Sequence, residues 1–228
     1  MIIGMVGLIG SGKGTVGDYL CEKYHFQRES FAKPLKDAAA IIFNWPRHLL
    51  EGDTPESRIW RDQVDVYWSE KLGWEVTPRD VLQKLGTEAG RQVFGNPLWT
   101  AALINRLVNH LPSFQSMRES PFKPIDFVIT DVRFENEMKA LRELGAKIIR
   151  VKRGPEPNWF ERAKFHLRNH PEESSMFYSL NGLVEKIHIS EYGWVNSEMD
   201  YVIPNDSSLE ELHICVDKIV NQLSTSDR

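Results

Sequence analysis

The chain opens with Met1-Ile2-Ile3-Gly4-Met5-Val6-Gly7-Leu8-Ile9-Gly10-Ser11-Gly12-Lys13-Gly14-Thr15, and the class of fold can be inferred from these residues. A short apolar run leads into a glycine-rich turn, and a helical pattern starts directly after it. Gly7 to Lys13 fits G-x-x-x-x-G-K, the pattern of a phosphate-binding loop between a buried strand and a helix. Glycines let successive N–H groups curve around an anion, and the helix points the positive end of its dipole at the same anion. The stretch therefore predicts an α/β fold with a phosphate site at this turn.

One position departs from the common motif. Ser or Thr usually follows the lysine and holds Mg²⁺, but here Gly14 takes that place and Thr15 comes next. Ser11 and Thr15 are therefore both candidates for the metal. The Gly-Lys-Gly-Thr ending resembles the loop of nucleoside monophosphate kinases such as adenylate kinase. A glycine-rich turn with an accidental lysine is the alternative, and the strand before it and helix after it argue against that.

The composition suits one α/β domain over residues 1–228, with a lid or small insertion. The chain is 41% hydrophobic and 26% charged, with a formal net charge of -4, so a nucleic acid polymer is not expected as the main partner. No apolar run is long enough to span a membrane, and no secretory signal is visible. Cys21 and Cys215 are expected as free core thiols in a reducing compartment, which favours a cytoplasmic location. The sequence also allows a homodimer.

A helix is predicted to begin at Thr77-Pro78, where a cap precedes a proline. Its apolar side chains are expected to face the core; they are Val81, Leu82, Leu85 and Val93. Small residues gather on the other face, at Gly86, Thr87 and Gly90. They indicate either close approach of a flat ligand or backbone, or ordinary helix packing.

A buried strand over residues 126–131 ends in the carboxylate Asp131. Arg133 follows it, and Glu137 comes one turn into the next helix. Ligands of open α/β sheets lie at the carboxyl ends of strands, so Asp131 is well placed for chemistry. A weak strand over 26–31 would bring Lys33 and Lys36 beside the phosphate loop if it neighbours the first strand.

Residues 152–187 lack sheet periodicity and are rich in basic side chains, beginning with Lys152-Arg153. We interpret them as a lid that carries arginines. Residues 44–76 show no clear pattern, and Arg58 within them could be a phosphate ligand or a solvent-exposed arginine.

Blocks spaced along the chain resemble the bacteriophage-type deoxynucleoside monophosphate kinases. They are Gly10-Ser11-Gly12-Lys13-Gly14-Thr15, Ala32-Lys33-Pro34-Leu35-Lys36-Asp37, Leu85-Gly86-Thr87-Glu88 with Trp99, Asp131-Val132-Arg133-Phe134-Glu135-Asn136-Glu137, His188-Ile189-Ser190-Glu191, and Asn205 to Leu212. Each block alone is a weak signal, whereas their order and spacing together are specific.

The resemblance implies a three-layer P-loop kinase fold with a central parallel sheet, a helical substrate-binding region at about 33–112 and a lid at about 152–187. It implies transfer of phosphate from ATP to a deoxynucleoside monophosphate, with Mg²⁺. The residues expected to bind ATP are Gly10, Ser11, Gly12, Lys13, Gly14, Thr15 and Arg153. Those expected to bind the acceptor are Lys36, Arg58, Gly86, Thr87, Trp99, Asp131, Arg133 and Glu137. The residues expected in catalysis are Lys13, Asp131 and Arg133, and the candidates for the metal are Thr15, Ser11 and Asp131.

Two alternatives remain from the sequence. The same kinase core could phosphorylate another small phosphorylated metabolite, such as phosphomevalonate. A nucleotide-dependent switch without transfer is the other, although the chain lacks the Asn-Lys-x-Asp motif that reads guanine.

Overall fold

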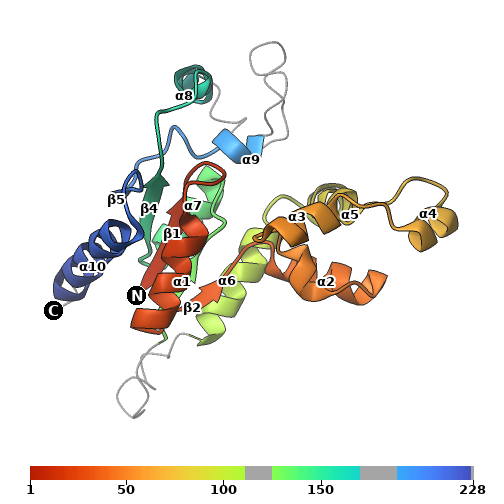
Figure 1. The fold of residues 1–228 in the computed structure, drawn as a ribbon, viewed down its shortest axis with the longest axis horizontal. Helices are drawn as coiled ribbons and strands as arrows, with labels where there is room; N and C mark the ends of the chain where they lie inside the picture. Colours follow the sequence, from red (N-terminus) through yellow and green to blue (C-terminus); the bar gives the residue numbers. More distant parts are fainter. Residues whose placement is uncertain (111–124, 170–188, 227–228) are drawn as a thin grey trace. The chain divides into compact units, whose positions relative to one another are not determined.

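The computed structural model describes residues 1–110, 125–169 and 189–226. It divides into two compact units, the first made of Met1–Ser30 with Ile104–Arg228 and the second of Phe31–Leu103. The second unit is one uninterrupted stretch of chain between two parts of the first (Figure 1). Residues 170–187 of the predicted lid lie outside the described residues, and the division into a substrate region and a lid stays a prediction.

A five-stranded sheet forms the centre of the first unit, in the order β2-β3-β1-β4-β5 with every neighbouring pair parallel. The strands are β1 (Ile2–Val6), β2 (Gln27–Glu29), β3 (Phe127–Ile129), β4 (Lys147–Lys152) and β5 (Tyr201–Pro204). β1 lies in the middle and is buried throughout, as expected for a parallel strand covered on both faces. Because the strands are parallel, the loops that follow β1, β3 and β4 all lie at the carboxyl end of the sheet. The predicted α/β class is confirmed.

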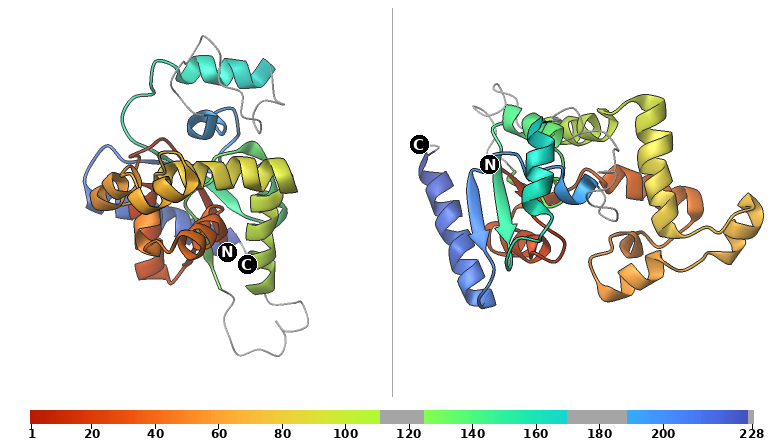
Figure 2. Two further views of the ribbon diagram at one scale, coloured as in Figure 1. Left: turned by 90° about the vertical axis from the view of Figure 1, so that its right-hand side faces the viewer. Right: turned by 90° about the horizontal axis from the view of Figure 1, so that it is seen from above.

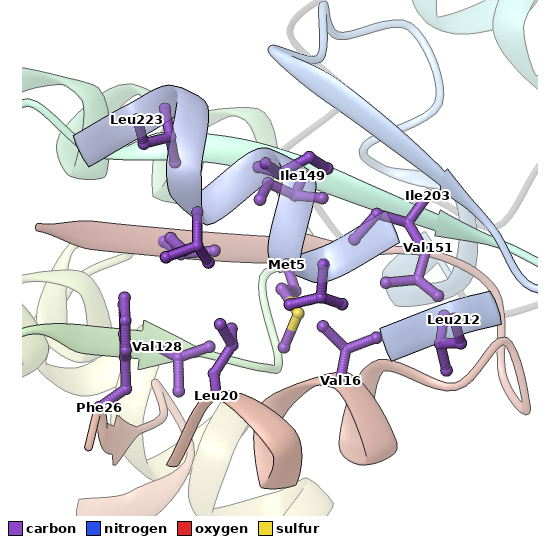
Figure 3. Packing of buried hydrophobic residues seen from close by; sticks show 14 residues of the cluster. Met5, Val16, Leu20, Phe26, Val128, Ile149, Val151, Ile203, Leu212 and Leu223 are labelled. Carbon is purple, nitrogen blue, oxygen red and sulfur yellow. The ribbon is translucent and has the colours of Figure 1, made fainter. Parts of the chain in front are cut away.

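Helices cover both faces of this sheet. Ile3 and Met5 of β1 pack in one core with α1 (Lys13–Tyr24) and α10 (Leu209–Ser226), as Figure 3 shows. Successive strand residues face opposite sides, and a Cβ placed on Gly4 would lie 3.1 Å from Leu141 of α7 (Glu135–Glu143) on the other face. The predicted three layers are confirmed, and Figure 2 shows α10 alongside β5.

The order of the strands tests whether the strand near residues 26–31 neighbours the first strand. β2 pairs with β3 and is separated from β1 by it. The condition under which Lys33 and Lys36 would lie beside the phosphate loop is therefore not met. Within the described residues, no helix is both long and apolar enough to cross a membrane.

The chain leaves the first unit after β2 and returns on α6 (Leu98–His110). Arg106 of α6 connects these two places, because its Nε and Nη2 donate to Glu29 Oε2 at 3.2 and 3.1 Å and its Nη2 donates to Ser30 O at 2.9 Å. Glu29 is only 5% exposed, so the ion pair is well shielded from water. The remaining described helices of this unit are α8 (Phe160–Asn169) and α9 (Ile189–Tyr192).

The second unit consists of short helices around a core of Ala39, Trp45, Leu50, Val76 and Val81. Its elements are α2 (Lys33–Phe43), η1 (Arg47–Leu50), α3 (Pro55–Arg61), α4 (Val66–Leu72), α5 (Pro78–Lys84) and the π-helix η2 (Leu85–Gln92). The predicted helix start at Thr77 is confirmed, because its side chain accepts a hydrogen bond from the backbone N–H of Asp80.

The prediction that Val93 faces the core is wrong, since this side chain is 70% exposed. The sequence suggests one α-helix after Thr77, but α5 continues as the π-helix η2. A π-helix has more residues per turn than an α-helix. Side chains beyond it are therefore rotated away from the face that a 3.6-residue period predicts, whereas Val81, before it, is buried as expected.

Candidate phosphate-transfer site

The glycine-rich loop joins β1 to α1 in a conformation that needs its glycines. Gly10 and Gly12 have φ of 75° and 103°, in the left-handed region that side chains disfavour. Gly7 has φ of 146°, and a Cβ placed on it would lie 2.4 Å from the carbonyl oxygen of Val151 on β4. The loop is therefore closely packed against the neighbouring strand at Gly7.

The start of α1 has the features of an anion site. The N-cap residue of this helix is Gly12, which has no side chain to cap it, and the first turn holds no acidic residue. The first N–H groups of a helix lack partners within the helix, and they carry the positive end of its dipole. Gly14 and Thr15 are exposed in this turn, and nothing described lies within 4 Å of a Cβ placed on Gly14. A phosphate can approach these N–H groups directly.

Lys13 is the first residue of α1, and its side chain turns back over the loop. Its Nζ donates to the carbonyls of Gly7 at 2.7 Å and Leu8 at 2.9 Å. Burial, followed by the positive charge of Arg133, lowers the pKa of Lys13 from 10.5 to about 8, while Glu191 and Asp131 oppose the shift. The ammonium therefore lacks enough negative charge around it, and a bound phosphate would supply that charge.

The loop after β3 brings Asp131 and Arg133 within electrostatic range of Lys13. Glu137 shapes this loop, since its carboxylate accepts from the N–H of Arg133 at 2.8 Å and of Phe134 at 3.2 Å. Glu137 is 3% exposed. This burial favours a role in fixing the backbone of the loop over direct contact with a ligand. The Arg133 side chain is 49% exposed and lies 3.9 Å from Glu191, so it can reach a ligand at the loop.

Two hydroxyl groups of the loop differ in their surroundings. The side chain of Ser11 is buried, and its Oγ has no hydrogen-bond partner among the described residues. Thr15 is exposed at the start of α1. No group of three or more His, Cys, Asp and Glu side chains forms a metal site in the described parts of the chain. Arg153 is exposed just beyond the carboxyl end of β4.

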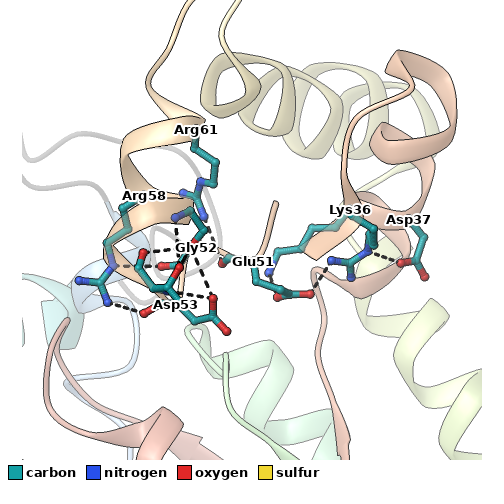
Figure 4. A network of polar contacts seen from close by, with 10 residues as sticks. Lys36, Asp37, Glu51, Gly52, Asp53, Arg58 and Arg61 are labelled. Atoms are coloured by element: carbon teal, nitrogen blue, oxygen red, sulfur yellow. Dashed lines mark hydrogen bonds and ion pairs between the residues drawn. The ribbon is translucent and has the colours of Figure 1, made fainter. Parts of the chain in front are cut away.

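In the second unit, Lys36 and Arg58 converge on one turn, residues 51–53 (Figure 4). Lys36 Nζ donates to Glu51 Oε2 at 2.5 Å. Arg58 donates from Nε to the carbonyl of Gly52 at 3.1 Å and from Nη2 to that of Asp53 at 2.9 Å. Burial opposes ionisation of Glu51, but Lys36 and then Arg47 outweigh it and lower the pKa of that carboxyl. The structure thus brings the two predicted cations to a common turn.

Trp99 and the small residues of η2 form one packed group in the same unit. The indole Nε1 of Trp99 donates to the carbonyl of Gly86 at 2.8 Å. A Cβ placed on Gly90 would lie 2.6 Å from the Trp99 ring, so Gly90 is required by the packing of this ring. Thr87 is half-buried between these glycines. Of the two interpretations of the small residues, close packing therefore accounts for Gly90.

Three side chains near the loop were not assigned a role from the sequence. Asn205 Nδ2 donates to the carbonyl of Ser11 at 2.8 Å, and Arg28 Nη2 donates to that of Gly14 at 2.8 Å. Glu191 is the third, facing Arg133. Asn205 and Glu191 belong to the closing blocks of the family resemblance and could have been singled out there. Nothing in the sequence around Arg28 indicates a contact with the phosphate loop.

A glycine-rich loop ending in Lys13, placed after the central strand of a parallel sheet and before an uncapped helix, defines the class of P-loop proteins. Comparison with known proteins narrows this class. A protein of Acanthamoeba polyphaga mimivirus, provisionally named a deoxynucleotide monophosphate kinase, is 31% identical over 155 residues, which are 67% of this chain and 74% of that one. The chain belongs to the deoxynucleotide monophosphate kinase family.

More distant relatives agree with this membership. The deoxynucleotide monophosphate kinase of Escherichia phage RB69 is 26% identical over 96% of this chain and 99% of its own. The deoxynucleoside-5'-monophosphate kinase of Escherichia phage T5 is 28% identical over 63% of this chain and 72% of its own. No protein-family model matches the sequence. A dephospho-CoA kinase structure from Campylobacter jejuni aligns over 97% of this chain and 96% of its own, with a TM-score of 0.46 and 14% identity, too distant to add to the assignment.

Proposed function

We propose that this protein transfers the terminal phosphate of ATP to a deoxynucleoside monophosphate, giving ADP and a deoxynucleoside diphosphate. The observation that carries the proposal is the position of Lys13, at an uncapped helix start and within electrostatic range of Arg133 and Asp131. Family membership supports the acceptor class, since the three relatives carry names of deoxynucleotide kinases.

The loop from Gly10 to Thr15 binds the β- and γ-phosphates of ATP in this proposal. Its N–H groups and the start of α1 hold the phosphate oxygens, while Lys13 exchanges its contacts with the Gly7 and Leu8 carbonyls for the phosphates. In this proposal Arg153, just beyond the end of β4, contributes to ATP binding. These groups position charge and need not form a covalent bond, which is what phosphoryl transfer requires of a protein.

Magnesium fits this loop. Thr15 offers an exposed hydroxyl and Asp131 a carboxylate near Lys13, and the buried Ser11 Oγ lacks a described partner. Few protein ligands suffice, because Mg²⁺ in such sites is held largely by phosphates and water. A bound Mg²⁺ would neutralise charge on the β- and γ-oxygens. We favour Thr15 and Asp131 as its ligands, because the side chain of Ser11 is 3% exposed.

The acceptor phosphate is already ionised at neutral pH, so no strong general base is needed. Arg133 holds this phosphate next to the γ-phosphate of ATP, and Glu137 fixes the backbone from which Arg133 extends. The family resemblance further assigns binding of the acceptor to Lys36, Arg58, Gly86, Thr87 and Trp99. A planar guanidinium suits a phosphate because it donates two parallel hydrogen bonds.

The test is a coupled assay of ADP release from ATP and Mg²⁺ over all deoxy- and ribonucleoside monophosphates. We expect turnover that depends on a deoxynucleotide and falls by orders of magnitude in Lys13→Ala, with folding retained by circular dichroism. Turnover of another phosphorylated metabolite, and of no deoxynucleotide, would show that the acceptor belongs to a different class. Slow ATP hydrolysis that no acceptor changes would instead indicate a switch without transfer.

A further inference from the structure

Two side chains from opposite edges of the sheet hold carbonyls of the phosphate loop. Asn205 follows the edge strand β5, and its Nδ2 donates to the carbonyl of Ser11 at 2.8 Å. Arg28 lies on the other edge strand, β2, and its Nη2 donates to the carbonyl of Gly14 at 2.8 Å. The two carbonyls lie on either side of Lys13 in the sequence.

Each of these contacts depends on a neighbouring glycine. A Cβ placed on Gly12 would lie 2.4 Å from Asn205 Nδ2, and one on Gly17 would lie 2.3 Å from Arg28 Nη2. Gly17 is inside α1 and has no positive φ. A glycine within a helix is destabilising relative to alanine, so its presence calls for a reason, and the close approach of Arg28 and Thr130 supplies one.

The backbone of Asn205 and the side chain of Arg28 are themselves held in place. The N–H of Asn205 donates to the carbonyl of Lys152 at 2.7 Å, continuing the pairing of β5 with β4. Arg28 Nη2 also lies 3.0 Å from the Asp18 carboxylate on α1. Their donors therefore stay fixed relative to the sheet, whereas Lys13 must leave its own carbonyl partners when it turns to a phosphate.

We propose that Asn205 and Arg28 are positioning residues for ATP: they hold the carbonyls of Ser11 and Gly14 outward, so that the N–H groups of Gly12 and Thr15, which share peptide groups with these carbonyls, face the phosphates. A peptide group has its C=O and N–H on opposite sides, so fixing one fixes the other. The inference rests on the proposed role of this loop in binding ATP. It does not depend on which acceptor is used.

The experiment measures the Kd of ATP by calorimetry without acceptor, and the KM of ATP and of the acceptor in the coupled assay. We expect Asn205→Ala to raise the Kd about fivefold and Arg28→Ala about tenfold, the larger effect following from the charged donor. The acceptor KM should stay within about twofold, and Arg28→Lys should restore part of the affinity.

Asn205→Asp separates positioning from packing. The carboxylate has nearly the same shape but cannot donate to the Ser11 carbonyl, so a positioning role predicts a loss at least as large as in Asn205→Ala. The matched controls are Asn221→Ala, on an exposed turn of α10, and Arg142→Ala. Like Arg28, Arg142 donates to a backbone carbonyl, that of Glu198, and lies near a carboxylate, that of Asp200, but it is away from the loop. Both controls should leave the Kd unchanged.

Unchanged ATP affinity in Asn205→Ala and Arg28→Ala would overturn the inference. So would wild-type affinity in Asn205→Asp, or equal losses in the controls. If the wild type binds ATP but turns over no deoxynucleotide, the acceptor assignment fails while the Kd comparison still tests the two residues. A wild type that does not bind ATP would overturn both proposals.

Discussion

Raising the pH from about 7.5 to 9.5 should weaken ATP binding, because Lys13 loses its proton in this range. Burial and then Arg133 lower its pKa from 10.5 to about 8 in the free protein, against the smaller opposing effects of Glu191 and Asp131. Bound phosphates add negative charge beside the ammonium, so the complex keeps the proton to higher pH. Binding above pH 8 therefore takes up a proton, and the Kd of ATP must rise with pH.

The size of the effect follows from the pKa. At pH 9.5 a group with a pKa of about 8 is protonated in only about 3% of molecules, against about 76% at pH 7.5, so the Kd should be about 25-fold higher than at pH 7.5. The free protein should show the opposite trend. Because the folded pKa is the lower one, the unfolded chain binds more protons between pH 8 and 10.5, and the free energy of unfolding gains up to about 3 kcal/mol from this group as pH rises through that window.

Calorimetry with ATP in buffers of different ionisation enthalpy measures both the Kd and the proton uptake. Lys13→Arg is the matched control, since a guanidinium stays charged throughout and should give a flat Kd. Neither carboxylates nor guanidinium groups ordinarily titrate in this window. A flat wild-type Kd up to pH 9.5, or an equal rise in Lys13→Arg, would refute the assignment of the proton to Lys13.

Three further variants test the remaining groups. Arg133→Ala should raise the KM of the acceptor more than the Kd of ATP, and the reverse order in a kinetic assay would contradict its role. Glu137→Ala should lower the free energy of unfolding by about 2 kcal/mol, because the N–H groups of Arg133 and Phe134 lose their acceptor, and should raise the acceptor KM as well; an unchanged KM would limit Glu137 to stability. Gly90→Ala should lower the free energy of unfolding by about 1–3 kcal/mol in chemical denaturation through overpacking against Trp99, and a neutral result would mean that the ring can shift.

The features that local patterns predict are those whose cause is local. The strand before Gly7, the helix after it and the cap at Thr77 each follow from a few adjacent residues, and all are present. The proximity of Lys13 and Asp131 follows equally simply, since each comes after a strand and parallel strands place such positions at the carboxyl end of the sheet. In the structure Lys13 and Asp131 are within electrostatic range of each other there.

What the sequence did not predict depends on distant partners or on a change of helical period. Val93 was misplaced because η2 departs from the period that the prediction assumed. Arg28 and Asn205 reach the loop only because β2 and β5 are the two edges of the sheet, and no periodicity specifies the order of strands. Gly90 is explained by Trp99, nine residues away and on another helix.

The Arg106 link to Glu29 and Ser30 bears on how such a protein can diversify. The stretch from Phe31 to Leu103 leaves the first unit after β2 and returns to it on α6, and the contacts of Arg106 join these two places. Closing a loop costs entropy that grows only slowly with its length, so this stretch can lengthen, shorten or be exchanged with little penalty to the first unit. The helical unit can then change in evolution while the phosphate loop, which belongs to the first unit, stays as it is.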